Sequence, residues 1–379
     1  MPAPTPAGTA VHPDPGGPRL PPARPGGAWA WARRNLFASA WSTLATVGAL
    51  AAAALVLPAT ARWALVDAVW RPDYQACRAL AYRGACWGMV AEKHRLILFG
   101  RYPHAEQWRP LLATLLVVLA LLVSGHPRAW RRWLLGLWTT AGVAFFVLLR
   151  GGLLGLSLVG SEAWGGFPLT VLLTLVGVGA SIPLGIGLAL ARRSGLPLLQ
   201  AGARLYIELV RGVPLITVLF VATFVFPLIL PQAVPLDALG RVVLAITLFQ
   251  AAYMAEVVRG GLQALPRGQL EAAESLGLSW WKTQRKVILP QALVLVIPSF
   301  VNSLLSTFMD TSLVTVVSMY DLTGALRLAL GDAQWRNFFI EGYLFVGAIY
   351  LVCCFGLSRY GHWLETRLGR WARREPSRA

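Results

Sequence analysis

Residues Arg259–Pro290 read RGGLQALPRGQLEAAESLGLSWWKTQRKVILP, a polar and net basic connection in a chain that is otherwise a succession of apolar runs. The spacing predicts a short helix, because Leu270, Ala273 and Gly277 fall at i, i+3 and i+7 and so share one face. A face of small apolar residues can enter a cleft on another protein. Gly277 then allows a turn, and Pro290 interrupts the helical hydrogen bonding where the next apolar run begins.

The composition predicts an integral membrane protein. Of the 379 residues, 56% are hydrophobic and only 13% are charged, and the mean hydropathy is +0.58. A soluble domain carries roughly 25% charged residues. Because the period-two polarity of transmembrane strands is absent and lipid leaves helices as the alternative, the predicted class is all-α. We attribute most of the net charge of +17 to membrane topology and contact with membrane lipid, and expect no nucleic acid partner.

Gaps between charged residues mark the spans, since a helix needs about 20 apolar residues to cross ~30 Å of hydrocarbon. We expect about eight transmembrane helices, of which the second and sixth have short apolar runs. The uncharged stretches are Asn35–Ala61, Pro110–Pro127, Trp133–Leu149, Ala163–Ala191, Gly212–Leu236, Val242–Ala255, Val287–Met309 and Gly342–Ser358.

The basic residues set the orientation, because cytoplasmic loops carry an excess of Lys and Arg. With the N-terminus inside and eight crossings, 21 of the 34 Lys and Arg residues fall on inside segments. Eight of the others lie in one outside segment near residues 62–109. We therefore expect a multi-pass protein with both termini and segment 259–290 in the cytoplasm.

Two regions differ from the spans in composition. Residues 1–34 are too rich in Pro and Gly to form a helix, which predicts a disordered cytoplasmic tail. The outside segment contains Cys77 and Cys86, which either form a disulfide, if the host is Gram-negative, or are two ordinary cysteines of a small amphipathic subdomain. Cys353 and Cys354 lie in the last apolar run. Neither pair has the further Cys or His spacing of a zinc site, so no metal is expected.

Charged residues near the membrane boundary should be paired. Glu208 and Arg211 are one helical turn apart and can form an ion pair on one face. Glu256 lies near the cytoplasmic end of the sixth span, where an isolated charge would cost roughly 2.5–3.5 kcal/mol. It should therefore face protein, water or Arg259. The glycines of the fourth span favour close helix packing over dinucleotide binding, because no strand precedes them.

Segment Arg259–Pro290 also resembles a known motif. Its residues follow the EAA-x3-G-x9-I-x-LP pattern of the cytoplasmic loop in ABC importer permeases of the polar amino acid type, at Glu271, Ala272, Ala273, Gly277, Val287, Leu289 and Pro290. Val287 stands where Ile is usual. The stretches YIELVRGVPLIT from Tyr206 and DTSLV from Asp310 resemble the same family, although Met309 replaces a common Lys.

The resemblance implies a five-span permease core over residues 165–370, followed by a basic tail over residues 371–379. Three extra spans and the outside segment, over residues 35–164, are similar to the longer eight-span subunits of general L-amino-acid and glutamate/glutamine/aspartate/asparagine systems. The resemblance also implies that the protein lies in the inner membrane. Its partners would be ABC ATPase subunits, a second permease subunit and an extracytoplasmic amino-acid-binding protein. The resemblance favours a heterodimer of this chain with a different permease subunit, and a homodimer is the alternative.

The resemblance assigns ATPase coupling to Leu270, Glu271, Ala272, Ala273, Gly277, Leu289 and Pro290. The chain itself is expected to be no enzyme and to bind no cofactor, because no GxxxxGK[ST] phosphate loop exists in the sequence. ATP and Mg²⁺ would be used by the partner ATPase.

Asn302, Ser303, Ser306 and Thr307 add polar groups to the seventh span, and interhelical hydrogen bonds are the alternative role for these four. The candidates for a transport path or gate are polar residues of this region. They are Asn302, Ser303, Ser306, Asp310, Thr311 and Ser312. We therefore expect a permease subunit of an ATP-driven, binding-protein-dependent importer of amino acids. The alternative is an ion-coupled secondary amino acid transporter, which would need ion-coupling carboxylates deep in the bundle and inverted repeats.

Overall fold

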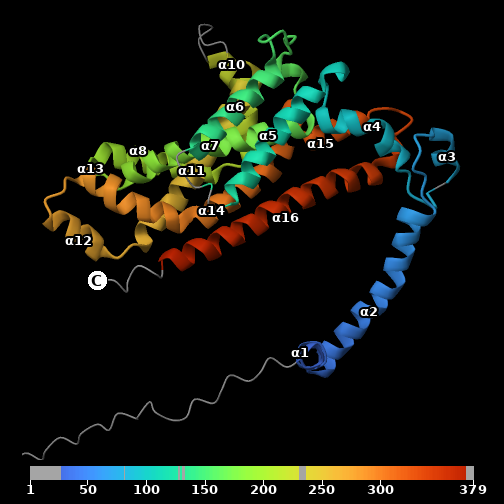
Figure 1. The fold of residues 1–379 in the computed structure, drawn as a ribbon, viewed down its shortest axis with the longest axis horizontal. Coiled ribbons are helices and arrows are strands. Elements are labelled where there is room, and N and C mark those ends of the chain that lie inside the picture. Colours follow the sequence, from blue (N-terminus) through green and yellow to red (C-terminus); the bar gives the residue numbers. More distant parts are fainter. Residues whose placement is uncertain (1–26, 81, 127–128, 130–132, 230–235, 373–379) are drawn as a thin grey trace, which may run out of the picture. The chain divides into compact units, whose positions relative to one another are not determined.

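The computed structural model describes residues 27–80, 82–126, 129, 133–229 and 236–372. Within these residues the regular structure is helical, and the two β-bridges are isolated pairs. The predicted all-α class is confirmed. The chain divides into two units, Met1–Ala68 and Val69–Ala379 (Figure 1).

The first unit contains α1 (Ala28–Asn35) and α2 (Ala40–Ala61). A capping box starts α2, since the Ser42 N–H donates to Ser39 Oγ at 3.2 Å and the Ser39 N–H to Ser42 Oγ at 2.9 Å. Residues Ala40–Val66 are long and apolar enough to span a membrane, as the first uncharged stretch predicted.

The prediction that residues 1–34 form no helix is wrong at its end. There the sequence AWAWARRN forms α1, because Ala and Trp replace the Pro and Gly of the preceding residues. Residues 1–26 of the predicted tail lie outside the described residues.

A pair of long helices, α7 (Gly166–Arg192) and α11 (Ala238–Ala264), forms the centre of the second unit. A Cβ added at Gly177 would come within 2.6 Å of the Ile246 side chain, and one at Gly185 within 2.4 Å of Met254 Cβ. The glycines of the fourth span therefore allow close helix packing, as predicted.

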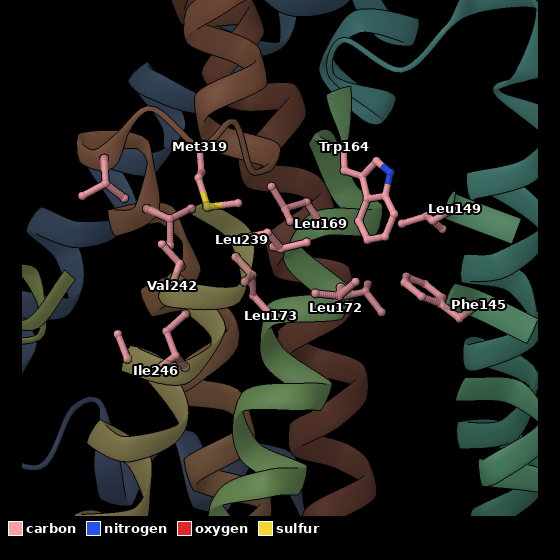
Figure 2. Close-up of a cluster of buried hydrophobic side chains, with 14 of the residues drawn as sticks. Phe145, Leu149, Trp164, Leu169, Leu172, Leu173, Leu239, Val242, Ile246 and Met319 are labelled. Carbon is pink, nitrogen blue, oxygen red and sulfur yellow. The ribbon is translucent and has the colours of Figure 1, made fainter. Parts of the chain in front are cut away.

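Further helices surround this pair. They are α5 (Trp108–Ser124), α6 (Trp133–Arg150), α14 (Leu289–Asp310) and α16 (Phe339–Ala372). Side chains from α6, α7 and α11 meet in a buried cluster that includes Trp164 (Figure 2). The Trp164 Nε1–H donates to the Val159 carbonyl at 3.2 Å, and its ring packs edge-on against Phe146. The protein core, rather than the membrane interface, holds this indole.

Seven helices among the described residues are long and apolar enough to span a membrane, or eight if one bent pair counts as a single span. The bent pair joins α8 (Pro197–Gly212) to the helical stretch Leu215–Ile229 at 103°. This stretch, from α9 (Leu215–Phe220) to α10 (Phe226–Ile229), is shorter than the predicted fifth span Gly212–Leu236. Residues 230–235 lie outside the described part.

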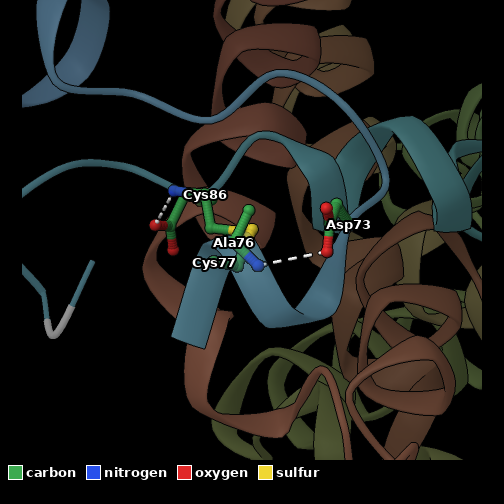
Figure 3. The surroundings of a disulfide bond; sticks show 5 residues. Asp73, Ala76, Cys77 and Cys86 are labelled. Atoms are coloured by element: carbon green, nitrogen blue, oxygen red, sulfur yellow. Dashed lines mark hydrogen bonds between the residues drawn. A yellow bond between two sulfur atoms is a disulfide. The ribbon is translucent and has the colours of Figure 1, made fainter. Parts of the chain in front are cut away.

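The second unit also holds most of the predicted outside segment, with α3 (Tyr74–Ala79) and α4 (Gly88–Phe99). Cys77 and Cys86 form a disulfide (Figure 3). The buried Glu341 carboxylate of α16 accepts a hydrogen bond from the Cys86 N–H at 2.7 Å. Apolar residues around the disulfide pack with α15 (Leu322–Ala329), so the segment is part of the core's own packing.

Candidate coupling loop and polar groove

Helix α12 (Arg267–Ser275) occupies the centre of the EAA-like segment. It ends in a reversal at Gly277, whose φ of +69° lies in the left-handed region that favours glycine. The Leu278 N–H donates to the Ala273 carbonyl at 3.2 Å, and the Gly277 N–H to the Glu274 carbonyl at 2.9 Å. These bonds satisfy carbonyls at the helix end and produce the predicted turn.

The apolar face of α12 is turned toward its own chain. Ala273 is only 3% exposed, and Leu270 packs against the buried cluster formed by the ends of α7 and α11 and the start of α14. The prediction that Leu270 and Ala273 offer a free docking face is therefore wrong. A short apolar helix face buries itself against the nearest apolar surface, which here belongs to this chain.

A different face of the segment is exposed. Glu271, Ala272 and Gly277 lie on it, and Leu276 is 80% exposed beside them. The rings of Trp280 and Trp281, 46% and 58% exposed, stack at 6.1 Å. An exposed Leu and two exposed Trp side chains in this segment are typical of a surface that another protein covers.

The exposed segment continues directly into the seventh span. Helix α13 (Trp280–Thr283) passes through a π-helical turn, Gln284–Ile288, into α14, and the whole run Trp280–Val317 forms one continuous helical stretch. Leu289 packs on the same buried cluster as Leu270, and Pro290, which has no N–H to donate, lies directly after the π-helical turn at the start of α14. Movement of the segment would therefore move α14.

The Glu256 carboxylate, surrounded by three guanidinium groups, joins helices α7, α8 and α11. Glu256 accepts hydrogen bonds from Arg192 of α7 at 2.5 Å and from Arg259 of α11 at 2.6 Å. Arg211 of α8 lies 3.8 Å away. The expectation that Glu256 faces protein and Arg259 is confirmed. This cluster ties three helices together.

The predicted ion pair between Glu208 and Arg211 is wrong. Arg211 faces Glu256 and lies over the Tyr253 ring, 5.5 Å from its centroid. Glu208 is exposed on α8. Spacing along one helix allowed the pair. In the structure Arg211 instead lies near the Glu256 carboxylate of the neighbouring helix α11, where two other arginines also bind.

A polar groove of about 770 Å³ runs between the start of α9, α11 and α14. Four of the six predicted path residues line it, namely Asn302, Ser303, Ser306 and Asp310. They follow one stripe of α14 at helical spacing. The groove thus collects polar side chains inside otherwise apolar helices.

The other two predicted path residues do not line the groove. Thr311 is 1% exposed, and its hydroxyl donates to the Phe308 carbonyl at 2.9 Å. Ser312 is partly buried in the 3₁₀-helix Thr311–Val317 that follows α14. Thr311 thus makes a local hydrogen bond, to the residue three positions before it, and does not reach the groove.

Sequence reasoning missed the part of the groove that α11 supplies. Gln250 and Tyr253 line it, and the Gln250 amide donates to the Thr307 hydroxyl of α14. The signal was present in the sequence, because Gln250 is an uncharged polar residue inside the apolar run Val242–Ala255.

Comparison with known proteins places this architecture in a family. A family model described as binding-protein-dependent transport system inner membrane component matches residues 181–370. The chain is 42% identical to the inner membrane amino-acid ABC transporter permease protein YhdY of Escherichia coli, over 90% of this chain and 93% of that protein. It is 35% identical to the glutamate/glutamine/aspartate/asparagine transport system permease protein BztC of Rhodobacter capsulatus, over 93% and 96%.

A shorter relative and a solved structure match only part of the chain. The probable amino-acid ABC transporter permease protein YckA of Bacillus subtilis is 33% identical over 54% of this chain and 88% of that protein. A crystal structure of an amino acid ABC transporter with histidines is 30% identical over 53% of this chain and 92% of that chain, with a TM-score of 0.48. The two longer relatives match over 90% and 93% of this chain. The family match also decides against the ion-coupled secondary transporter. This protein belongs to the family of inner membrane components of binding-protein-dependent transport systems.

Proposed function

We propose that the chain is the permease subunit of an ATP-driven importer that receives amino acids from an extracytoplasmic binding protein. One observation carries the proposal: the last part of the EAA-like segment, from the exposed Trp280 onward, and the α14 side of the polar groove lie on a single continuous helical stretch, Trp280–Val317. The names of the similar proteins YhdY and BztC support amino acids as cargo.

The exposed face around Glu271, Ala272 and Leu276 is the surface that we assign to the partner ATPase. ATP and Mg²⁺ would be used on that subunit, and this chain would bind no cofactor. Segment 259–290 and both termini would then lie in the cytoplasm, with the membrane being the inner one. The excess of Lys and Arg on these segments supports this orientation.

The groove also requires a second wall. Asn302 and Ser306 are exposed in this chain although they lie on a candidate span. Polar side chains facing lipid are unfavourable, because lipid offers them no hydrogen-bond partner. We infer that a second permease subunit covers them, and we favour a heterodimer with a shorter homologous subunit.

Copurification tests the assignment. Glu271→Trp changes an exposed residue of the segment, and Glu365→Trp makes the same change at an exposed position near the end of α16. We expect the ATPase to follow the wild-type chain and Glu365→Trp through detergent, but not Glu271→Trp at equal protein level. Amino acid uptake should be lost with the ATPase. Full uptake by Glu271→Trp would overturn the proposal.

A further inference from the structure

The predicted outside segment is firmly attached to the part of the core that follows the groove. Helix α14, which lines the groove, ends at Asp310, and the chain continues through the 3₁₀-helix Thr311–Val317 to α15. Cys77, Cys86 and Met89 share one buried cluster with Leu322 and Leu326 of α15. Residues 69–109 precede the family match at 181–370, so this attachment is an addition to the shared core.

Polar contacts hold the attachment in one arrangement. The Lys93 ammonium donates to Asp332 at 2.8 Å, and the ring of Tyr74 packs edge-on against Trp335 with centroids 6.0 Å apart. The hydrogen bond from Lys93 keeps the pKa of Asp332 below its ordinary value. With the disulfide and the Glu341 contact, these interactions join the segment to α16 and to the residues that follow α15.

This surface carries arginines that the protein does not pair. Arg71, Arg78 and Arg83 are exposed on the segment, and Arg327 and Arg336 are exposed beside it on the core. None of the five forms an ion pair within the described residues.

The carboxylates nearby are already engaged. Asp73 accepts from the Ala76 N–H at 3.1 Å, Glu92 and Asp332 pair with Lys93, and Glu341 holds the Cys86 N–H. The surface therefore has a surplus of positive charge. Basic residues on the outer side run against the usual distribution, so topology does not account for them.

We propose that this basic surface, defined by Arg71, Arg78, Arg83, Arg327 and Arg336, is a docking site for an acidic face of the extracytoplasmic binding protein. The inference rests on the proposed function and its orientation. Exposed aromatic rings accompany the charges, with Trp70 56% and Tyr82 71% exposed. Arg, Trp and Tyr are the residues enriched at protein interfaces. The rigid connection to α15 places the docked protein where the groove ends.

The test uses the complete transporter in nanodiscs of phosphatidylcholine, together with the binding protein that supports its uptake in cells. Association and dissociation rates are measured for the wild type and two triple variants. One is Arg71→Gln/Arg78→Gln/Arg83→Gln, and the other is Arg71→Lys/Arg78→Lys/Arg83→Lys. All three positions are exposed, so folding should be preserved, and the ATPase should still copurify.

We expect the Gln variant to associate about 10-fold more slowly at low salt, because exposed charges act mainly through the association rate. The Lys variant should stay near the wild type. The difference should shrink at 0.15 M salt, where the screening length is about 8 Å. Equal rates for the Gln variant and the wild type would overturn the proposal.

A second arm separates the binding protein from lipid. Nanodiscs with added phosphatidylglycerol are compared with phosphatidylcholine alone. A different outcome is that the Gln variant binds the binding protein as fast as the wild type in phosphatidylcholine and differs from it only when phosphatidylglycerol is added. In that case the surface would bind lipid headgroups, and the docking proposal would be wrong. If the wild type bound no binding protein at all, the proposed function itself would fail.

Discussion

Arg192 of α7 donates a hydrogen bond to Glu256 of α11 at 2.5 Å, and thereby ties the two central helices close to the start of the EAA-like segment. Arg259 binds the other carboxylate oxygen at 2.6 Å. One carboxylate thus satisfies two guanidinium groups and lies near a third, that of Arg211.

Replacing this carboxylate should weaken the whole helix junction. Glu256→Gln leaves three arginines without a counter-charge in a partly buried site, and we expect a loss of about 1–2 kcal/mol, discounted for the partial exposure of the group. Thermal unfolding in detergent measures it. Glu365→Gln, at an exposed position, is the control. An unchanged melting temperature for Glu256→Gln would show that the cluster contributes no stability.

Neighbouring alanines in α12 should respond differently to the same change. Ala273 is buried, so Ala273→Leu should overpack the junction and cost about 1–3 kcal/mol. Ala272 is exposed, so Ala272→Leu should leave stability unchanged and reduce ATPase copurification. Stability and bound ATPase are measured on the same preparations. The opposite pattern would restore the buried face as the docking surface.

Substitutions at Asp310 and Thr311 should have different effects, the first on transport and the second on stability. Asp310 lines the groove, so Asp310→Asn should lower uptake while the protein remains as stable as the wild type. Thr311 donates a buried hydrogen bond, so Thr311→Val should cost about 1 kcal/mol of stability with little change in substrate affinity. Uptake in proteoliposomes and unfolding in detergent report the two effects. Normal uptake by Asp310→Asn would remove it from the path.

The disulfide should stabilise the attached segment. Cys77→Ala/Cys86→Ala removes a cross-link of sequence separation 9, and loss of a disulfide typically costs about 2–4 kcal/mol. Proteolysis between residues 69 and 100 should become faster in the variant, whereas Cys353→Ala/Cys354→Ala should have no such effect. Equal proteolysis rates, or two free thiols in a mass map of the wild type, would contradict this.

The ion pair between Lys93 and Asp332 should make the segment sensitive to acid. Because the pKa of Asp332 is lowered in the folded protein, its stabilising effect is present above its unfolded pKa of about 3.9 and is lost as the pH falls through the lower folded value. Hydrogen exchange of α4 at pH 7 and about pH 3 measures the change. Asp332→Asn should lose this pH-dependent component, and an identical acid response in both proteins would refute it.

Much of the architecture follows from the sequence alone. Uncharged stretches located the spans, because an apolar helix must be long enough to cross the hydrocarbon layer. Glycine spacing indicated the close approach of α7 to its neighbour, and the pattern from Glu271 to Pro290 located the exposed segment. All of these signals are local in sequence.

Only the tertiary structure decided what covers each face. Periodicity placed Leu270 and Ala273 on one side of α12, but the ends of α7 and α11, far away in sequence, decided that this side is buried. Arg211 likewise lies near the carboxylate of Glu256 on another helix, and not near that of Glu208 one turn away on its own helix. A sequence pattern describes the faces of one helix, whereas the partner of each face depends on contacts between distant segments, which no local spacing encodes.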